Sequence, residues 1–315
     1  MAGHSHGDGG HDHAHAHPAP ASLGPRLLLS VAINVVIVLA QFAGGLLSNS
    51  LGLISDAAHN LSDVVALMVS YGAFRAGELP ATPQRTFAYK RAEVIAAFVN
   101  AAALIAVAGW VLFAAAGRLL HPQEVAGLPV IVLAAFGLVA NAGAALLLRG
   151  FHDLNARAAF LHLVADAASS LGVLVAGVLV WAFHWYAADA IVSAALSVWM
   201  IREAYKIARS SVGILLEGTP EGLDFHDVRD EILASEGVRG VHELHVWSLS
   251  SSEMALSAHV EFDECTLAET TVLVTTLKAG LADRFGITHA TIEPECAGGT
   301  CAGALCSLPE RMEAR

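Results

Sequence analysis

Charged side chains are scarce in this chain of 315 residues, since Asp, Glu, Lys and Arg together make up only 15% of it. Hydrophobic residues reach 55%, and the mean hydropathy is +0.58. A typical soluble domain carries about 25% charged residues, so this composition excludes an ordinary soluble protein. The balance is typical of a polytopic membrane protein that carries a smaller soluble part.

Cysteine and positive charge are scarce as well. The four cysteines are Cys265 and a late group, Cys296, Cys301 and Cys306, which is not the pattern of a disulfide framework. The formal net charge of −12 argues against nucleic acid as a partner. Residues 1–22 lack a basic n-region, so we expect no secretory signal before the first apolar stretch.

Long apolar runs, by contrast, are abundant. Six stretches approach the roughly 20 residues that a helix needs to cross a bilayer, and they lie near 27–47, 51–74, 94–116, 128–148, 158–183 and 187–208. The short Ser48-Asn49-Ser50 connection makes the first two a helical hairpin. The sequence therefore predicts a six-helix transmembrane bundle, all α-helical, over residues 23–209.

Lys and Arg flank these stretches almost entirely on one side. The other side has only Arg118, whereas this side carries Arg26, Arg75, Arg85, Lys90, Arg91, Arg149, Arg157, Arg202, Lys206 and Arg209. Cytoplasmic loops of membrane proteins carry such an excess. We therefore expect both termini and the soluble part to face the cytosol.

The soluble part is predicted over residues 210–295. A helix is expected over 224–236, strands over 238–249 and 253–262, a second helix over 266–285, and a third strand over 287–293. Apolar residues alternate with polar ones in the second strand, which is typical of a half-buried strand. The order αββαβ predicts a small two-layer α+β domain.

Two terminal tails complete the chain. Residues 1–22 consist mainly of small and polar residues, so we expect a disordered cytosolic tail. Its histidines are typical of weak, multivalent metal capture, with an affinity tag as the alternative; they are His4, His6, His11, His13, His15 and His17. Residues 296–315 form a Gly-rich tail, whose candidate metal ligands are Cys296, Cys301 and Cys306.

Two HxxxD pairs lie inside the second and fifth apolar stretches: His59 with Asp63, and His162 with Asp166. Residues four apart share one face of a helix. Titratable groups at membrane depth cost at least a few kcal/mol each, so four of them indicate a function. Two imidazoles and two carboxylates form a complete tetrahedral set for zinc. The alternatives are a polar helix–helix contact and a protonated carboxylate pair.

Other polar residues in these stretches have several interpretations. Asp56 shares the helix face of the first pair, where it would orient a ligand histidine, line a water path or serve as a ligand itself. Asn34, Gln41 and Asn100 fit packing or a water path. Asp189 fits either a charge at its own helix N-terminus or a functional group.

The donor types predict both the cargo and the coupling. A site of two imidazoles and two carboxylates suits zinc, and by extension cadmium or cobalt, whereas an all-oxygen site would suit magnesium or manganese. Ligand histidines lose their protons on binding metal, so protons and metal compete near neutral pH. A membrane protein that exchanges one for the other is an antiporter.

Three further stretches accompany the HxxxD pairs: Arg85-Thr86-Phe87-Ala88-Tyr89-Lys90-Arg91-Ala92-Glu93, Leu215-Leu216-Glu217-Gly218-Thr219-Pro220 and Leu244-His245-Val246-Trp247-Ser248-Leu249. With them, residues 25–295 resemble the cation diffusion facilitator family of zinc exporters, in its bacterial zinc-preferring form. The resemblance implies six transmembrane helices, a ferredoxin-like cytosolic domain, a homodimer in the inner membrane, and efflux of zinc in exchange for protons.

The same resemblance implies a metal site in the cytosolic domain at His242, His259 and Glu295. His259 lies opposite the apolar face of its strand, whereas His242 and His245 face opposite sides unless the strand bulges. Further candidates are His245, His289 and Glu293, and solvated surface histidines are the alternative. We expect Arg91 and Glu93 to form a structural ion pair, and no metal site in their loop, which lacks histidine.

Two other classes of protein are compatible with a membrane metal site. An intramembrane metalloenzyme would need an open coordination position and a general base, but the sequence has no HExxH motif and four protein ligands would close the site. We therefore expect no enzyme. A membrane-anchored metal sensor would use the soluble domain as its working part, and its metal response would survive the loss of Asp63.

Overall fold

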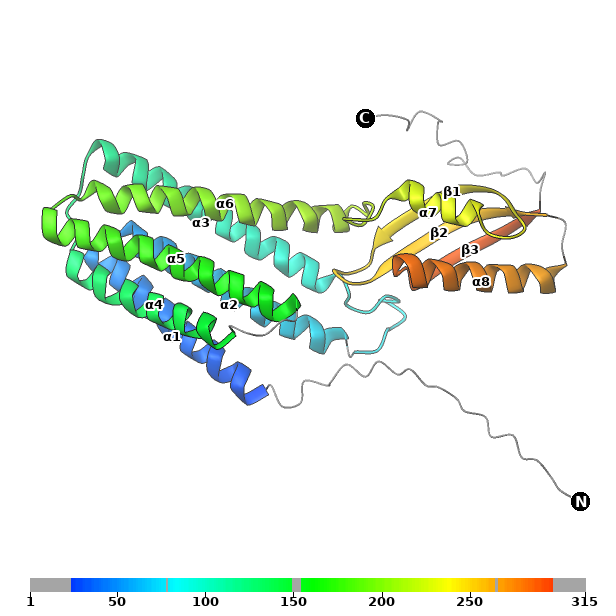
Figure 1. Cartoon of the computed structure of the whole chain (residues 1–315), viewed down its shortest axis with the longest axis horizontal. Helices are drawn as coiled ribbons and strands as arrows, with labels where there is room; N and C mark the ends of the chain where they lie inside the picture. Colours follow the sequence, from blue (N-terminus) through cyan, green and yellow to red (C-terminus); the bar gives the residue numbers. More distant parts are fainter. Residues whose placement is uncertain (1–23, 78, 149–153, 264–265, 297–315) are drawn as a thin grey trace, which may run out of the picture.

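The computed structural model describes residues 24–77, 79–148, 154–263 and 266–296. A bundle of long helices lies at one end of the molecule and a smaller domain with a β-sheet at the other (Figure 1). The bundle consists of α1 (Gly24–Ser48), α2 (Leu51–Gly77), α3 (Ala92–Leu120), α4 (Gly127–Leu148), α5 (Leu154–Phe183) and α6 (Ala187–Leu215). Each helix contains one of the predicted apolar stretches, although α6 continues to Leu215 where the prediction ends at 208, and α5 begins at Leu154 where the prediction begins at 158.

Three described helical segments are long and apolar enough to cross a membrane: Ala92–Leu120, Gly127–Leu146 and Phe160–Phe183. Asn34–Ser48 is apolar but shorter. Helices α2 and α6 carry several charged and polar side chains, which lower their hydropathy. Many large apolar side chains on the bundle are exposed, Leu47, Phe113 and Phe183 among them, which is expected where lipid replaces water.

Helices α3 and α6 run side by side through the bundle (Figure 1). The buried residues Ala101, Ala108 and Ala115 recur every seven positions of α3, which puts small side chains on one face. Buried Ser193 and Ser197 lie four apart on α6. Small residues let helix backbones approach closely, and this close packing is typical of membrane bundles.

The smaller domain contains α7 (Phe225–Leu233), β1 (Val238–Ser248), β2 (Met254–Phe262), α8 (Leu267–Phe285) and β3 (His289–Cys296). The sheet has the order β1-β2-β3, with β1 antiparallel and β3 parallel to β2. Both helices lie over one face of the sheet (Figure 1), where a core forms from Val228, Ile232, Leu256, Val260, Phe262, Leu277 and Leu281. The opposite face of the sheet is left to polar side chains.

Strand β1 bulges between His242 and His245. The backbone at Glu243 has a φ of 46°, a left-handed conformation that is uncommon for a residue with a side chain. His242 lies opposite His259 of β2, and His245 lies opposite Ser257. The extra residue lets both histidines leave the strand on the face away from the core, which a regular strand would not allow.

The two parts of the molecule meet at the end of the bundle where α3 begins and α6 ends. Glu93 at the start of α3 accepts hydrogen bonds from the backbone N–H and the hydroxyl of Ser251, in the turn after β1, at 2.9 and 2.6 Å. Lys90 pairs with Glu253 of the same turn. Arg91 pairs with Glu217 at 3.0 Å, so the expected Arg91–Glu93 ion pair is wrong and each residue has a partner beyond α6.

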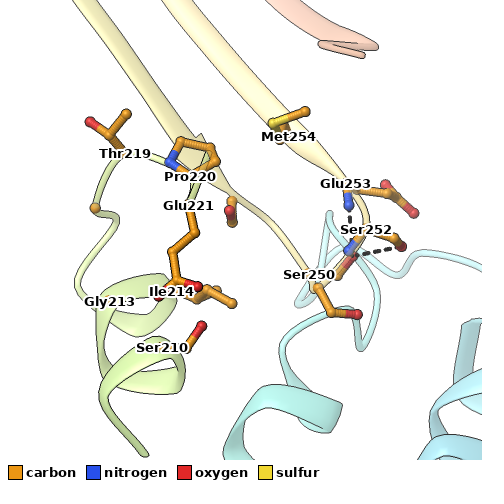
Figure 2. Close-up of a pocket in the computed structure, with 13 residues that line it drawn as sticks. Ser210, Gly213, Ile214, Thr219, Pro220, Glu221, Ser250, Ser252, Glu253 and Met254 are labelled. Atoms are coloured by element: carbon orange, nitrogen blue, oxygen red, sulfur yellow. Dashed lines mark hydrogen bonds between the residues drawn. The ribbon is translucent and has the colours of Figure 1, made fainter. Parts of the chain in front are cut away.

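A cavity of about 310 Å³ lies on another side of this junction. Figure 2 shows its walls: Ser210 and Ile214 at the end of α6, the loop of Thr219, Pro220 and Glu221, and the turn from Ser250 to Met254. Ser250 accepts hydrogen bonds from the backbone of Ser252 and Glu253, which shapes the turn. Polar contacts therefore join the sheet domain to the bundle beside α3, and a cavity separates the two parts beside the end of α6.

Candidate metal centres

The four residues of the two HxxxD pairs meet between α2 and α5. The Nε2 atom of His59 lies 3.0 Å from Oδ1 of Asp166 and 3.7 Å from Oδ2 of Asp63. The Nε2 atom of His162 lies 3.6 Å from Oδ2 of Asp63 and 3.5 Å from Oδ2 of Asp166. Each imidazole therefore stands between a carboxylate of its own helix and one of the other helix, as the one-turn spacing on each helix predicts.

Burial is uneven across this cluster. The side chains of Asp166 and His59 are 6% and 14% exposed, whereas those of Asp63 and His162 are 29% and 51% exposed. One ligand atom each from His59, Asp63 and Asp166 lies within 4.8 Å of the others, and His162 stands at the edge of this group. Asp63 and His162 are the members one turn nearer the sheet domain. Access to the cluster thus increases toward that end of the bundle.

An aromatic residue of a third helix also contacts His59. The His59 ring contacts the ring of Trp199 from α6 edge-on, with centroids 5.0 Å apart, while the His59 and His162 rings lie 6.3 Å apart. Trp199 limits how the imidazole of His59 can turn. No local motif singles out Trp199 in the sequence, because its role depends on how α6 packs against α2.

Asp56 lies outside the cluster of ligand atoms. It is 1% exposed and accepts hydrogen bonds from Gln41, Ser169 and Ser170. Asp189, 1% exposed, contacts the start of α2 rather than the metal cluster. Asn100 donates to Ser62 of α2 at 3.0 Å and so contributes to helix packing.

A second cluster forms on the polar face of the sheet. Oε1 of Glu295 lies 2.6 Å from Nδ1 of His259, and Oε2 lies 3.4 Å from Nε2 of His242. One ligand atom of each residue lies within 4.8 Å of the others. The hydrogen bond to Glu295 raises the pKa of His259 above its ordinary value, and the carboxylates of Glu293, Glu295 and Glu243 act in the same direction.

The other candidate ligands in the sheet domain have different surroundings. Glu293 lies 3.5 Å from Nε2 of His259, whereas His245 is exposed and lies outside the described cluster. His289 packs edge-on against Phe87 of the loop before α3, at the domain junction. Two acidic neighbours, Glu243 and Glu261, were missed in the sequence. Glu243 reaches His259 through the bulge, which alternation along a regular strand does not predict.

The candidate ligands of the tails lie outside the described residues. This holds for Cys301, Cys306 and the six histidines of residues 1–22. Cys296 is the last residue of β3, but its side chain is not described.

Known proteins resemble this chain over most of its length. The cation efflux transmembrane domain matches residues 27–216, and the cytoplasmic domain of cation efflux proteins matches residues 220–296. A cadmium, cobalt and zinc/H(+)-K(+) antiporter of Bacillus velezensis is 37% identical, over 86% of this chain and 88% of its own length. The metal cation efflux system protein CzcD of Cupriavidus metallidurans is 35% identical over 85% of both chains.

The zinc transporter ZitB of Yersinia pestis is 32% identical, over 86% of this chain and 87% of its own length. Among solved structures, the metal-bound C-terminal domain of the CzcD transporter is 42% identical, with a TM-score of 0.22, and the match covers 23% of this chain and 99% of that one. Because the family models and these full-length relatives match most of the sequence, the chain belongs to the cation diffusion facilitator family of multi-pass membrane proteins, which transport metal cations and are not enzymes.

Proposed function

We propose that this protein exports zinc from the cytosol in exchange for protons, through a tetrahedral site formed by His59, Asp63, His162 and Asp166. The observation that carries this proposal is the meeting of two imidazoles and two carboxylates from α2 and α5, with N–O distances of 3.0 to 3.7 Å. This donor set suits zinc, and it also accepts cadmium or cobalt. The names of the bacterial relatives include all three metals.

Proton exchange follows from the ligand type. An imidazole binds metal only in its neutral form, so zinc entering the site displaces any proton held by His59 or His162. A site that opens first to one side and then to the other therefore carries either zinc or protons. The greater exposure of Asp63 and His162 supports a site open toward the cytosolic end in this structure. Rocking of the helices around a midplane site would then expose it to the exterior.

The topology that this function needs has six transmembrane spans, over residues 23–209, with both termini in the cytosol. The excess of Lys and Arg on one side of the bundle supports this orientation, as does the position of the sheet domain at that end (Figure 1). The bacterial origin of the relatives supports an inner-membrane location.

We assign the domain of residues 210–295 to a ferredoxin-like fold that lacks the first strand, because its order is αββαβ and β3 runs parallel to β2. We propose that it dimerises two copies of the chain and binds zinc at His242, His259 and Glu295. Glu293 is the next candidate, since it lies beside His259. Zinc bound there regulates transport only if its affinity differs between the inward-open and outward-open states.

Two tails would assist this cycle. The histidines of residues 1–22 would raise the zinc concentration near the cytosolic entrance, and the cysteines of residues 296–315 would add a further metal site. Both roles rest on residue types in the sequence alone.

Zinc flux into proteoliposomes tests the transport proposal. Purified protein is reconstituted with a pH dye inside the vesicles, a pH gradient is imposed, and zinc uptake is followed for wild type and Asp63→Ala. The expected result is zinc uptake that follows the gradient, moves protons the other way and is lost in Asp63→Ala. Asp230→Ala, an exposed change on α7, is the matched control and should transport normally.

Three other outcomes would contradict parts of the proposal. Equal flux in wild type and Asp63→Ala would remove the intramembrane cluster from the mechanism. Zinc flux without proton movement in the opposite direction would exclude an antiporter, but the protein would still be a zinc transporter. Absence of flux in a folded wild-type dimer would favour the membrane-anchored metal sensor.

A further inference from the structure

A carboxylate that is not part of the metal cluster lies buried one helical turn beyond it. Asp56 is on α2, three residues before His59 and farther from the sheet domain. Its Oδ1 accepts a hydrogen bond from Ser169 at 2.7 Å, and its Oδ2 accepts from Gln41 at 2.7 Å and from Ser170 at 3.2 Å. Within the described residues, no Lys or Arg lies at salt-bridge distance from Asp56. Three neutral donors on two other helices therefore hold this carboxylate.

The network reaches four helices of the bundle. Gln41 on α1 is 1% exposed, and its amide oxygen accepts a hydrogen bond at 3.1 Å from Asn60, the residue after His59. Gly137 of α4 covers the network: a Cβ atom there would lie 2.9 Å from Nε2 of Gln41 and 3.1 Å from Oγ of Ser170. Helix α4 can approach this closely only because position 137 lacks a side chain.

The network also touches the ligand residues on both helices. Asp56 and Asn60 flank His59 on α2. Ser169 lies one turn after Asp166 on α5, and its hydroxyl is 2.9 Å from the backbone oxygen of Asp166. Among the described residues, polar contacts between α2 and α5 join either two metal ligands or Asp56 with Ser169 and Ser170.

The contacts among the four metal ligands do not by themselves hold α2 and α5 at a fixed distance. Without metal, the carboxylates of Asp63 and Asp166 repel each other when both are charged, and during transport the metal leaves. The hydrogen bonds of Asp56 involve no ligand atom, so they require neither a bound metal nor a particular charge on the ligands. Leaving a buried donor or acceptor without its partner is costly, so these bonds favour one register of α2 against α5.

We propose that Asp56 is a positioning residue for the transport site: by bonding Ser169 and Ser170 it fixes α2 against α5, so that the two HxxxD pairs stay within coordination distance of one another. The inference rests on the proposed function, because it concerns how the same site is built. Removing a group that orients metal ligands without binding the metal itself typically weakens metal affinity by about 10–100-fold.

The test measures zinc affinity of full-length protein in detergent by competition with a chromophoric chelator. A His242→Ala/His259→Ala background removes the cytosolic site, and the binding that Asp63→Ala abolishes in this background is assigned to the intramembrane site. For that component, Asp56→Ala should weaken zinc binding by about 10–100-fold. Asp56→Asn keeps a side chain that hydrogen-bonds both serines, so it should recover most of the loss.

Cobalt(II) absorption supplies a readout of geometry. The visible bands of tetrahedral Co²⁺ at the intramembrane site should shift or weaken in Asp56→Ala and return in Asp56→Asn. Ser197→Ala is the matched control, because it removes a buried hydroxyl that has no hydrogen-bond partner among the described residues. Ser197→Ala should leave both the affinity and the spectrum unchanged.

Folding is checked by size exclusion and circular dichroism. If Asp56→Ala does not fold, Ser170→Ala and Gly137→Ala take its place: one removes a donor, the other crowds the network, and both should weaken zinc binding. Wild-type affinity and spectrum in the folded variants would overturn the proposal. An equal loss in Asp56→Asn and Asp56→Ala would also overturn it, because the charge rather than the position would then matter. If Asp63→Ala abolishes no binding and no transport, the proposed function fails instead.

Discussion

Each imidazole of the intramembrane cluster stands between two carboxylates, and this alternation sets the chemistry of the site. The mixed nitrogen and oxygen donors favour a borderline-soft ion over a hard one. In the proposed metal site the carboxylates would also offset the charge of a divalent ion that has lost its water. At the scale of single residues, changing one donor type should therefore change which ion is preferred.

We expect His59→Asp to shift metal preference toward hard ions, because it replaces a nitrogen donor by an oxygen. Selectivity for Zn²⁺ over Mn²⁺ should fall by about tenfold, equivalent to about 1.4 kcal/mol. Competitive uptake of the two ions into proteoliposomes measures this ratio. His245→Asp is the control, since it makes the same change on an exposed residue outside the cluster. An unchanged ratio in His59→Asp would exclude His59 as a ligand.

The stability of the metal-free protein should depend on the protonation of His259. Its pKa is raised in the folded state, chiefly by the hydrogen bond to Glu295, relative to a value of about 6.5 in the unfolded chain. This stabilisation is complete below the unfolded pKa and is lost as the pH rises through the folded pKa. The Tm of metal-free protein should therefore fall from pH 5.5 to pH 8 through this group.

Glu295→Gln should reduce that pH dependence, because the amide holds an imidazolium less strongly than a carboxylate does. Glu231→Gln is the control. Glu231 pairs with Arg284 on the opposite face of the sheet domain and has no contact with His259. If Glu295→Gln keeps the full wild-type slope of Tm against pH, the assignment to His259 is wrong.

At the scale of elements, the start of α2 is held by another helix. Asp189, in the first turn of α6, accepts hydrogen bonds from the backbone N–H groups of Leu51 and Gly52 at 2.9 and 3.2 Å, and from the hydroxyl of Ser50 at 2.5 Å. The first N–H groups of a helix have no partner within it. Asp189 thus caps α2, the helix that carries His59, rather than its own helix.

Arg118 of α3 also contacts the turn between α1 and α2. It lies 3.9 Å from Asp189 and donates to the backbone oxygen of Asn49 at 2.5 Å. Asn49 has a φ of 56°, which is tolerated better by asparagine than by most residues, and it turns the chain from α1 into α2. The lone arginine on this side of the bundle therefore has a structural partner.

Asp189→Ala should destabilise the protein by about 1–3 kcal/mol, because it leaves buried N–H groups of α2 without an acceptor. Asp189→Asn keeps one acceptor oxygen and should cost less. Thermal unfolding of full-length protein in detergent, followed by tryptophan fluorescence, measures the difference. Asp230→Ala, an exposed change in the sheet domain, is the control. A Tm for Asp189→Ala equal to that of the control would contradict the capping role.

At the scale of the whole molecule, the sheet domain contacts the bundle through a few polar side chains and the Phe87–His289 ring pair, and a cavity lies beside these contacts. The turn after β1 bonds Glu93 and Lys90 beside α3, and the cavity of Figure 2 lies beside the end of α6. Small polar interfaces between domains permit relative motion. Metal bound to the sheet domain would thus act on α3 chiefly through this turn.

Glu93→Ala should loosen the turn after β1, because it removes both hydrogen bonds to Ser251. Hydrogen exchange of the backbone over residues 249–254 should become faster, while exchange in α8 stays the same. Mass spectrometry of the full-length protein reports both regions. Glu221→Ala, on the cavity side of the same junction, is the matched control. Unchanged exchange in Glu93→Ala would show that Glu93 does not hold the turn.

Much of the architecture follows from local patterns in the sequence. The apolar runs predict the bundle, and the strand and helix periods predict the αββαβ order, because both depend on neighbours a few residues apart. The spacing of His59 from Asp63, and of His162 from Asp166, places each pair on one helix face for the same reason. The capping box of Thr266 and Glu269 places the start of α8 at Leu267, one residue after the predicted boundary at 266.

Other features depend on contacts between distant segments. The bulge at Glu243, which brings His242 opposite His259, is a property of the pairing between two strands. The partners of Arg91 and Glu93 lie beyond α6, so their adjacency in the sequence misled the ion-pair prediction. Trp199, likewise, reaches His59 from another helix.

The sequence by itself determined which donors this protein offers to a metal and at what spacing along each helix, because helical periodicity is a local property of the chain. Only the tertiary structure decided that the two pairs face each other, that Asp56 joins α2 to α5, and that Asp189 caps α2. These depend on helix register and rotation, which arise from packing among residues more than 100 positions apart.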